Sequence, residues 1–229
     1  MTAWVTVFVI RLSRGAVVAK ELVGATFAGV LHSDRWSAYN WLANQHRQLC
    51  WAHLTRDFQK WVERGGVATP LGQRLLDLRE QMFEYWHHVR DGTWQRQVFQ
   101  IKMEWIEREA GALLRQGRDC ADAVVRGMCA DLLKREAALW TFVRVAEVEP
   151  TNNAAEQALR PAVLWRKGSF GTQSAAGSEF VARMLTVVTT CRQQGRNVMD
   201  YMTAACEAAL CHGPAPSLLP EASQARVAG

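Results

Sequence analysis

The sequence opens with a long stretch that has no acidic residue, and it lacks several familiar catalytic motifs. The first aspartate or glutamate is Glu21, so the first 20 positions contain no carboxylate side chain. The chain also contains no G-x-S-x-G, no Walker loop and no G-x-G-x-x-G. These absences argue against a serine α/β-hydrolase, a P-loop NTPase and a dinucleotide-binding enzyme.

Paired cysteines and long apolar runs are missing as well. The six cysteines form no C-x-x-C pair, whereas a secreted disulfide framework has a denser set in a shorter chain. The apolar run MTAWVTVFVI is far shorter than the ~20 residues that cross a membrane. Arg11 and Arg14 follow this run instead of preceding it as in a signal peptide. We therefore expect a cytoplasmic protein with no membrane partner.

The composition fits one large domain, or one domain that carries an insertion. The chain has 229 residues, of which 49% are hydrophobic and 21% charged, and this is ordinary for a folded protein. Ten tryptophans indicate a substantial packed core. The net charge of +5 permits a nucleic-acid partner but does not by itself indicate one.

The N-terminal part has the pattern of a strand, a helix and a second strand. Residues 4–12 are apolar on both alternating faces, which predicts a buried strand. Residues 16–24 have helical spacing, and residues 27–34 predict a second strand that ends at Asp34. Such a unit places its two strands parallel, and ligands gather at the carboxyl ends of parallel strands. Asp34 is therefore predicted to lie at a ligand-binding edge.

The rest of the chain is predicted to be mainly helical. An amphipathic helix is expected over RQLCWAHLTRDFQKW, with the alternative that its first residues form a short strand. Three amphipathic helices are predicted from residue 70 to about residue 145, a short helix after Pro150, and two more over 178–194 and 198–211. Proline and small residues dominate residues 213–229, which predicts a disordered tail.

Two acids stand at ends of predicted elements, and each has a structural and a functional interpretation. Asp34 either caps the turn after its strand or offers a carboxylate to a divalent cation. Glu156 follows Asn153 at the spacing of a capping box, and Arg160 offers it a surface ion pair. Pro161 is expected to limit this helix. The local pattern alone favours the structural interpretation of both acids.

A cationic segment follows Glu156. Arg166 and Lys167 lead into the loop GSFGTQSAAG, which can bring backbone N–H groups close to phosphates. A solvated, exposed basic face without a DNA partner is the alternative.

Cys50 and His53 share the apolar face of a predicted helix. We favour core packing over a zinc site there, because no second ligand pair has suitable spacing.

Three segments resemble the transposases of the insertion-sequence-66 family: SDRWSAYNWL, RQLCWAHLTRDFQKW and PTNNAAEQALRPAVLWRKGSFGTQS. The resemblance runs from the first predicted strand to about residue 211. It implies an α/β fold with a ribonuclease-H-like core and a DDE triad, in which Asp34 is the second acid and Glu156 the third. Residues 1–62 would then be the N-terminal part of the core, 63–148 an all-helical insertion, and 149–212 a helical C-terminal part with the glutamate helix.

The resemblance also implies a metal-dependent DNA reaction. Two Mg²⁺ (or Mn²⁺) ions held by carboxylates assist an in-line displacement at phosphorus, so Asp34 and Glu156 are the expected catalytic and metal-binding residues. The expected partner is DNA, as element ends and as target, and enzymes of this mechanism usually act as homo-oligomers on paired ends. The side chains assigned to DNA contact are Asn152, Asn153, Arg160, Arg166, Lys167, Arg192 and Arg196.

One part of the family pattern is missing from the sequence. The first acid of the triad belongs upstream of residues 4–12, and no acid precedes Glu21. We therefore expect a fragment truncated at its N-terminal strands, which is inactive alone because two carboxylates do not hold a pair of metal ions. The alternatives are an active enzyme whose product is longer, a DNA-binding or oligomerising remnant that interferes with a full-length transposase, and an unrelated helical interaction protein.

Overall fold

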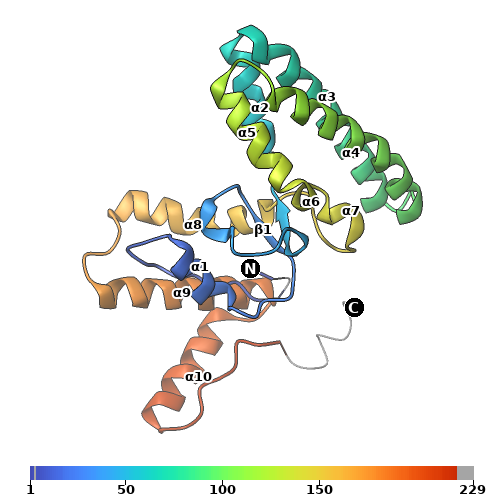
Figure 1. The fold of residues 1–229 in the computed structure, drawn as a ribbon. Coiled ribbons are helices and arrows are strands. Elements are labelled where there is room, and N and C mark those ends of the chain that lie inside the picture. The colour runs from blue at the N-terminus through green and yellow to red at the C-terminus, as the bar shows by residue number, and fades with distance from the viewer. Residues whose placement is uncertain (3, 221–229) are drawn as a thin grey trace. The chain divides into compact units, whose positions relative to one another are not determined.

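The structure, a computed structural model, describes residues 1–2 and 4–220 and divides into two compact units (Figure 1). One unit is Gly15–Asn153, which holds the strands and a block of helices. The other combines Met1–Arg14 with the chain from Ala154 onward, and it holds three long helices.

A two-stranded parallel sheet is the only sheet in the part of the chain that the structure describes. Strand β1 (Leu31–Ser33) pairs with β2 (Arg47–Leu49). Two 3-10 helices, η1 (Ser37–Tyr39) and η2 (Asn44–His46), lie in the connection between them. The predicted strand before Asp34 is thus confirmed in its last residues, and so is the alternative of a short strand at the start of RQLCWAHLT.

Two predicted helices of this unit are also confirmed. Helix α1 (Ala16–Val23) ends at Gly24, whose φ of +90° favours glycine. Helix α2 (Trp51–Arg64) ends at Gly65 with a φ of +77°. The apolar face of α2 is buried, as its 3.6-residue period predicts, at Leu54, Phe58 and Trp61.

The helical block follows α2 and matches the prediction for residues 70 to about 145. Its members are η3 (Gly66–Ala68), α3 (Thr69–Arg90), α4 (Arg96–Arg118), α5 (Ala123–Lys134), α6 (Glu136–Leu139) and α7 (Thr141–Arg144). The three predicted amphipathic helices are α3, α4 and the segment from α5 to α7. This last segment breaks at Arg135 and at Trp140, so it forms three helices instead of one.

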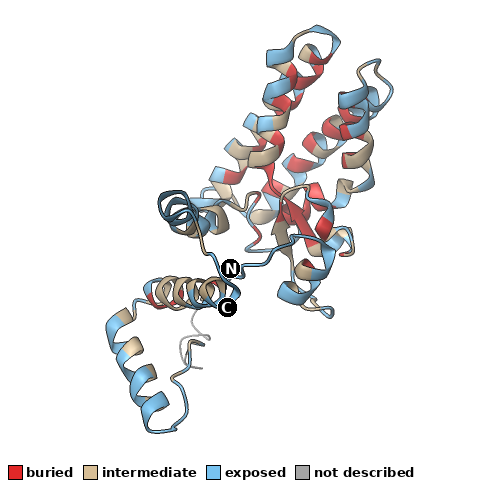
Figure 2. Ribbon diagram, turned by 90° about the vertical axis from the view of Figure 1, so that its left-hand side faces the viewer, coloured by how far each residue is buried: buried red, intermediate tan, exposed pale blue. Residues whose placement is uncertain are grey.

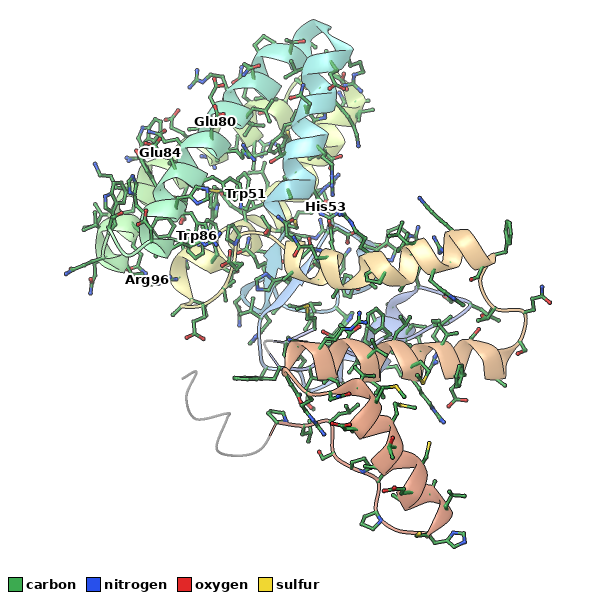
Figure 3. The ribbon with its side chains drawn as sticks, turned by 180° about the vertical axis from the view of Figure 1, so that it is seen from behind. Trp51, His53, Glu80, Glu84, Trp86 and Arg96 are labelled. Atoms are coloured by element: carbon green, nitrogen blue, oxygen red, sulfur yellow. The ribbon has the colours of Figure 1, made fainter. Side chains whose placement is uncertain are left out.

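Aromatic side chains fill the centre of this block. Its buried residues lie on the facing sides of the helices (Figure 2), and Trp51 and Trp86 point into the block in Figure 3. The centroids of the Trp51 and Trp140 rings are 5.0 Å apart. The centroid of the Trp86 ring lies 5.8 Å from that of Phe99 and 5.5 Å from that of Phe142. These tryptophans thus form part of the packed core that the composition indicated.

One buried glutamine bonds the helical block to strand β2. Gln48 is fully buried, and its Nε2 donates to the carbonyls of Leu49 (2.8 Å) and Leu139 (3.1 Å). Its Oε1 accepts from the backbone N–H of Phe142 at 2.8 Å. The indole N–H of Trp51 also donates to Leu139 (2.9 Å). Strand β2 and the turn between α6 and α7 are therefore joined by direct polar contacts.

The predicted strand over residues 4–12 is wrong. This segment is extended but pairs with no strand among the described residues, and it belongs to the unit that contains α9 (Ala175–Gln193). The hydroxyl of Thr190 accepts from the backbone N–H of Thr6 (3.2 Å) and donates to its carbonyl (3.0 Å). Threonine hydroxyls of a helix thus satisfy the backbone groups that a neighbouring strand was predicted to satisfy.

The extended N-terminal segment buries one of its two alternating faces, where the sequence predicted that both would be buried. Thr6 and Phe8 are buried, whereas Val7 and Val9 between and after them are exposed. Only one face of the segment is covered, because a helix and not a sheet packs on it. The predicted strand–helix–strand crossover therefore does not form.

The second unit contains three long helices. They are α8 (Asn153–Ser169), α9, and α10 (Val198–Leu210), and the last two confirm the helices predicted over 178–194 and 198–211. Helix α8 is longer than predicted, since Pro161 lies inside it. An internal proline removes one backbone donor, and the helix continues beyond that missing bond to Ser169.

The chain after α10 has no regular structure up to residue 220. Its backbone carbonyls accept side-chain hydrogen bonds from the same unit: Pro216 from Tyr201 (3.0 Å), Ser217 from Arg196 (2.9 Å) and Leu218 from Gln194 (2.8 Å). This part of the predicted disordered tail is therefore bonded to the unit. Residues 221–229 of that prediction lie outside the described residues.

The fold is thus mainly helical, with one small parallel sheet. Two short strands do not identify a ribonuclease-H-like core, so that core stays a prediction, as do the predicted domain boundaries. Within residues 1–2 and 4–220, no helix combines the length and the apolar character that crossing a membrane requires.

Candidate functional site

Asp34 lies directly after β1, at the carboxyl end of a parallel strand. Its Oδ1 accepts a hydrogen bond from the backbone N–H of Trp36 at 2.9 Å. The aspartate therefore caps the turn that follows the strand, which is its structural interpretation. A carboxylate oxygen can accept from a backbone N–H and still bind a cation, so this contact leaves the functional interpretation open.

A buried arginine holds the loop that carries Asp34. Arg47 of β2 is 1% exposed. Its guanidinium donates to the Ser33 hydroxyl (3.1 Å), to the Asp34 carbonyl (3.4 Å) and to Asn40 Oδ1 (3.2 Å). One side chain thus fixes both ends of the loop from residue 34 to residue 40.

The charges around this loop act on one another. Burial lowers the pKa of the Arg47 guanidinium, and the nearby charge of Arg135 lowers it further, while the charge of Asp34 raises it. Burial also raises the pKa of Tyr39, and the negative charge of Asp34 adds to this effect. Asp34 therefore lies in a partly buried, charged environment and not on an open surface.

The residue after Asp34 connects the loop to the helical block. Arg35 forms an ion pair with Asp57 of α2 (2.9 Å) and a longer one with Asp131 of α5 (3.6 Å). Asp131 also pairs with Arg135. The side chains of Arg35, Asp57 and Asp131 are 23–32% exposed, and a network of such pairs orients a loop more than it stabilises the fold.

Residues 150–152 are fixed beside the same two strands. The Pro150 carbonyl accepts from the backbone N–H of Trp51 (3.0 Å), and the Thr151 carbonyl is 3.3 Å from Nδ1 of His32. The backbone N–H of Asn152 donates to the Cys50 sulfur at 3.4 Å. Cys50 is 1% exposed, so core packing is confirmed for this cysteine.

His32 of β1 makes this contact through its ring Nδ1. A carbonyl only accepts, so His32 Nδ1 carries the proton that bonds Thr151. Burial lowers the pKa of the His32 ring, and the hydrogen bond to Thr151 and the charge of Glu149 oppose that effect. His32 therefore bonds the backbone of residues 150–152, and the lowering of its pKa favours the neutral ring.

Glu156 lies in the first turns of α8 and is partly buried. The helix begins at Asn153, one residue earlier than the predicted capping box requires. Asp34 belongs to the Gly15–Asn153 unit and Glu156 to the other unit. The contacts of each acid are therefore those made within its own unit.

The residues assigned to DNA contact have different environments. Arg160, Arg166 and Lys167 are exposed on α8, as are Asn153 at its start and Arg192 near the end of α9. Arg196 instead bonds the Ser217 carbonyl (2.9 Å) and lies over the Tyr201 ring. Asn152 is partly buried, and its Oδ1 has no hydrogen-bond partner.

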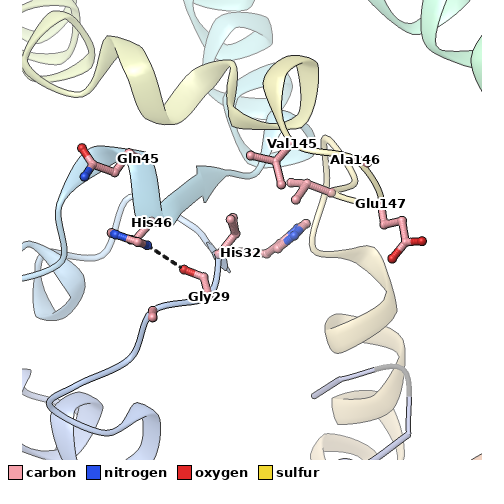
Figure 4. Close-up of a pocket in the computed structure, with 10 residues that line it drawn as sticks. Gly29, His32, Gln45, His46, Val145, Ala146 and Glu147 are labelled. Carbon is pink, nitrogen blue, oxygen red and sulfur yellow. Dashed lines mark hydrogen bonds between the residues drawn. The ribbon is translucent and has the colours of Figure 1, made fainter. Parts of the chain in front are cut away.

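A surface hollow lies at the amino ends of the two strands (Figure 4). Its volume is about 530 Å³, and its polar lining includes His32, His46 and Glu147. His46 Nδ1 bonds the Gly29 carbonyl at 3.0 Å. Among the described residues, no group of three or more His, Cys, Asp or Glu side chains is arranged to hold a metal ion. The hollow contains neither predicted acid.

Sequence reasoning missed Arg47, Arg35 and Gln48, the polar residues that build this region. Arginine and glutamine in an amphipathic pattern are usually solvent-exposed, and no local signal marked these three as buried or bridging. Their partners come from segments far along the chain, such as Asp131 and Leu139.

Known proteins resemble this chain over most of its length. It is 30% identical over 214 residues to the uncharacterized protein y4qI of Sinorhizobium fredii, which covers 83% of this chain and 37% of y4qI. It is 26% identical over 206 residues to y4hP of the same organism, which covers 78% of this chain and 36% of y4hP. The chain thus spans little more than a third of these relatives. No solved structure matches it.

The family comparison covers both candidate acids. The family described as "Transposase IS66 family" matches residues 2–180, which include Asp34, Glu156 and the cations of α8. This match extends over well more than half of the chain. The chain therefore belongs to the IS66 family of transposases.

Proposed function

We propose that the chain supplies part of a DDE-type DNA transposition site, with Asp34 and Glu156 as its second and third acids. Family membership supports transposition as the reaction. The observation that carries the proposal is the place of Asp34 at the carboxyl end of a parallel strand, where such sheets bind ligands. Glu156 lies within residues 2–180, which the family comparison matches, and this supports its role as the third acid.

The proposed reaction has two displacements at phosphorus. Water first cleaves a phosphodiester at the end of the element and releases a 3′-hydroxyl. This hydroxyl then attacks a phosphodiester of the target DNA, and a target 3′-oxygen leaves. Mg²⁺ or Mn²⁺ is the proposed cofactor of the complete enzyme, because such ions activate the attacking oxygen and stabilise the leaving one.

The residues present do not make a complete two-metal site. The carboxylates of Asp34 and Glu156 are oxygen donors of the kind that Mg²⁺ prefers. However, the described residues contain no group of three potential ligands, and no acid precedes Glu21. We therefore propose that residues 1–229 alone bind a metal ion weakly and do not complete transposition.

A strand-joining assay tests this proposal. Residues 1–229 are incubated with Mg²⁺, a plasmid target, and labelled DNA that carries insertion-element ends. We expect no joined product. A joined product that Asp34→Asn abolishes and Asp77→Asn preserves would overturn the proposed inactivity. A product that survives Asp34→Asn would overturn the role of Asp34. Asp77 is a matched control because it is an exposed acid bonded only locally, by Gln73.

DNA binding without catalysis is a second candidate function, and the exposed face of α8 favours it. Arg160, Arg166 and Lys167 are exposed there, and the sequence has no acid from residue 157 to residue 178. With Arg192 they offer four phosphate contacts, so log K for duplex DNA should fall with log[salt] at a slope of about −3.6.

Paired variants test which cations bind the phosphates. Replacing both Arg166 and Lys167 by alanine should reduce the slope to about −2. The control is Arg183→Ala, because the Arg183 guanidinium already pairs with Glu179 on the same helix. A slope near zero for the unmodified chain, or the same slope for both variants, would contradict the proposed DNA contact.

A further inference from the structure

The turn between α8 and α9 carries an aromatic side chain that its own unit does not use. Phe170 is 94% exposed. Its φ of +59° lies in the left-handed region, which bulky residues rarely adopt. Glycine or asparagine would fit this backbone with less strain. Neither packing nor backbone conformation therefore explains a phenylalanine at this position.

The turn holds Phe170 in a defined place. Gly171, with a φ of +82°, completes the reversal of the chain. Side-chain hydrogen bonds close the turn on both sides: from Ser169 to the Trp165 carbonyl (2.9 Å), from the Gly177 N–H to Ser174 (3.0 Å), and between Thr172 and Ser178 (2.5 Å). The exposed ring thus extends from a short, bonded turn and not from a long loop.

The surroundings of this ring are cationic and partly aromatic. Arg166 and Lys167 precede the turn and are exposed, and Trp165 is 40% exposed. The first acid after the turn, Glu179, pairs with Arg183. A partner that suits this surface has negative charges spaced along a chain, together with flat apolar faces. A nucleic-acid strand has both.

The exposed ring selects among forms of DNA. In a paired duplex the bases stack on one another and leave no face for Phe170. Unpaired bases expose their faces, and aromatic side chains stack on them with little regard to sequence. Cations next to such a ring bind the phosphates that flank the stacked base.

We propose that the α8–α9 turn binds unpaired DNA bases, with Phe170 stacked on a base and with Arg166 and Lys167 on the adjacent phosphates. This inference rests on the DNA-binding function proposed for the chain. It adds a substrate class to that function, a DNA end whose bases are opened or frayed.

Two DNA probes test the proposal with the full chain of 229 residues. One probe is a blunt duplex, and the other is the same duplex with several unpaired nucleotides at one end. Phe170→Ala should weaken binding of the tailed probe about tenfold or more and leave binding of the blunt duplex unchanged. Phe170→Trp should restore binding of the tailed probe. The side chain is exposed, so these variants fold, and circular dichroism checks this.

A control and a spectroscopic signal make the test specific. Trp105→Ala removes an exposed aromatic of α4 that lies between Glu104 and Glu107, and it should change neither probe. A 2-aminopurine base in the tail should be quenched by the unmodified chain but not by Phe170→Ala. An equal loss on both probes, or no loss, overturns the role of Phe170 while DNA binding stands. If the unmodified chain binds neither probe, the DNA-binding function itself fails.

Discussion

Replacing Gln48 by methionine is expected to lower the free energy of unfolding by about 3–4 kcal/mol. Methionine fills a similar volume, but it cannot donate to the carbonyls of Leu49 and Leu139 or accept from the N–H of Phe142. The Leu139 carbonyl keeps the indole N–H of Trp51 as a donor. The groups left without a partner are therefore chiefly the Leu49 carbonyl and the Phe142 N–H. Each buried polar group that loses its partner costs about 1–3 kcal/mol.

The matched control for this prediction is Gln100→Met. Gln100 makes one hydrogen bond, to the Val143 carbonyl at 3.1 Å, and is only partly buried. Its replacement should lower the free energy of unfolding by about 1 kcal/mol. Urea unfolding followed by tryptophan fluorescence measures both losses. A loss for Gln48→Met no larger than that for Gln100→Met would contradict the view that Gln48 joins β2 to the helical block.

Helices with a clear period were predictable from the sequence, but the structure of residues 4–12 was not. The apolar stripe of α2 and the glycines at its end and at the end of α1 mark these helices locally. Residues 4–12 are apolar on both alternating faces, and this pattern looks the same whether a strand or a helix packs on the segment. The deciding groups, Thr186 and Thr190, lie about 180 residues later in the chain, where no local pattern reveals them.

The place of Asp34 after a strand was predictable from the sequence, but the residues that hold its loop were not. The end of a short apolar run identified Asp34, and the structure confirms that it follows a parallel strand. Arg47 was not predictable, because its partners are a strand residue and both ends of a loop. A buried arginine becomes favourable only when the fold brings those acceptors together.

Asp34 and Glu156 are the proposed ligands of one weakly bound metal ion. Residues 1–229 should bind one Mn²⁺ ion with a dissociation constant of about a millimolar, as expected for an incomplete carboxylate site. Asp34→Asn and Glu156→Gln should each abolish this binding, because the remaining carboxylate alone holds no ion. The double variant should lose nothing further, since groups that act on one ligand are not additive.

The most direct test of the central claim is a Mn²⁺ titration of these variants, followed by the electron paramagnetic resonance signal of the free ion. We predict that the unmodified chain and Asp77→Asn lower the free signal equally, whereas Asp34→Asn, Glu156→Gln and the double variant leave it as in buffer. If Glu156→Gln binds Mn²⁺ as the unmodified chain does while Asp34→Asn does not, the two acids do not share a metal ion, and the proposed site is wrong.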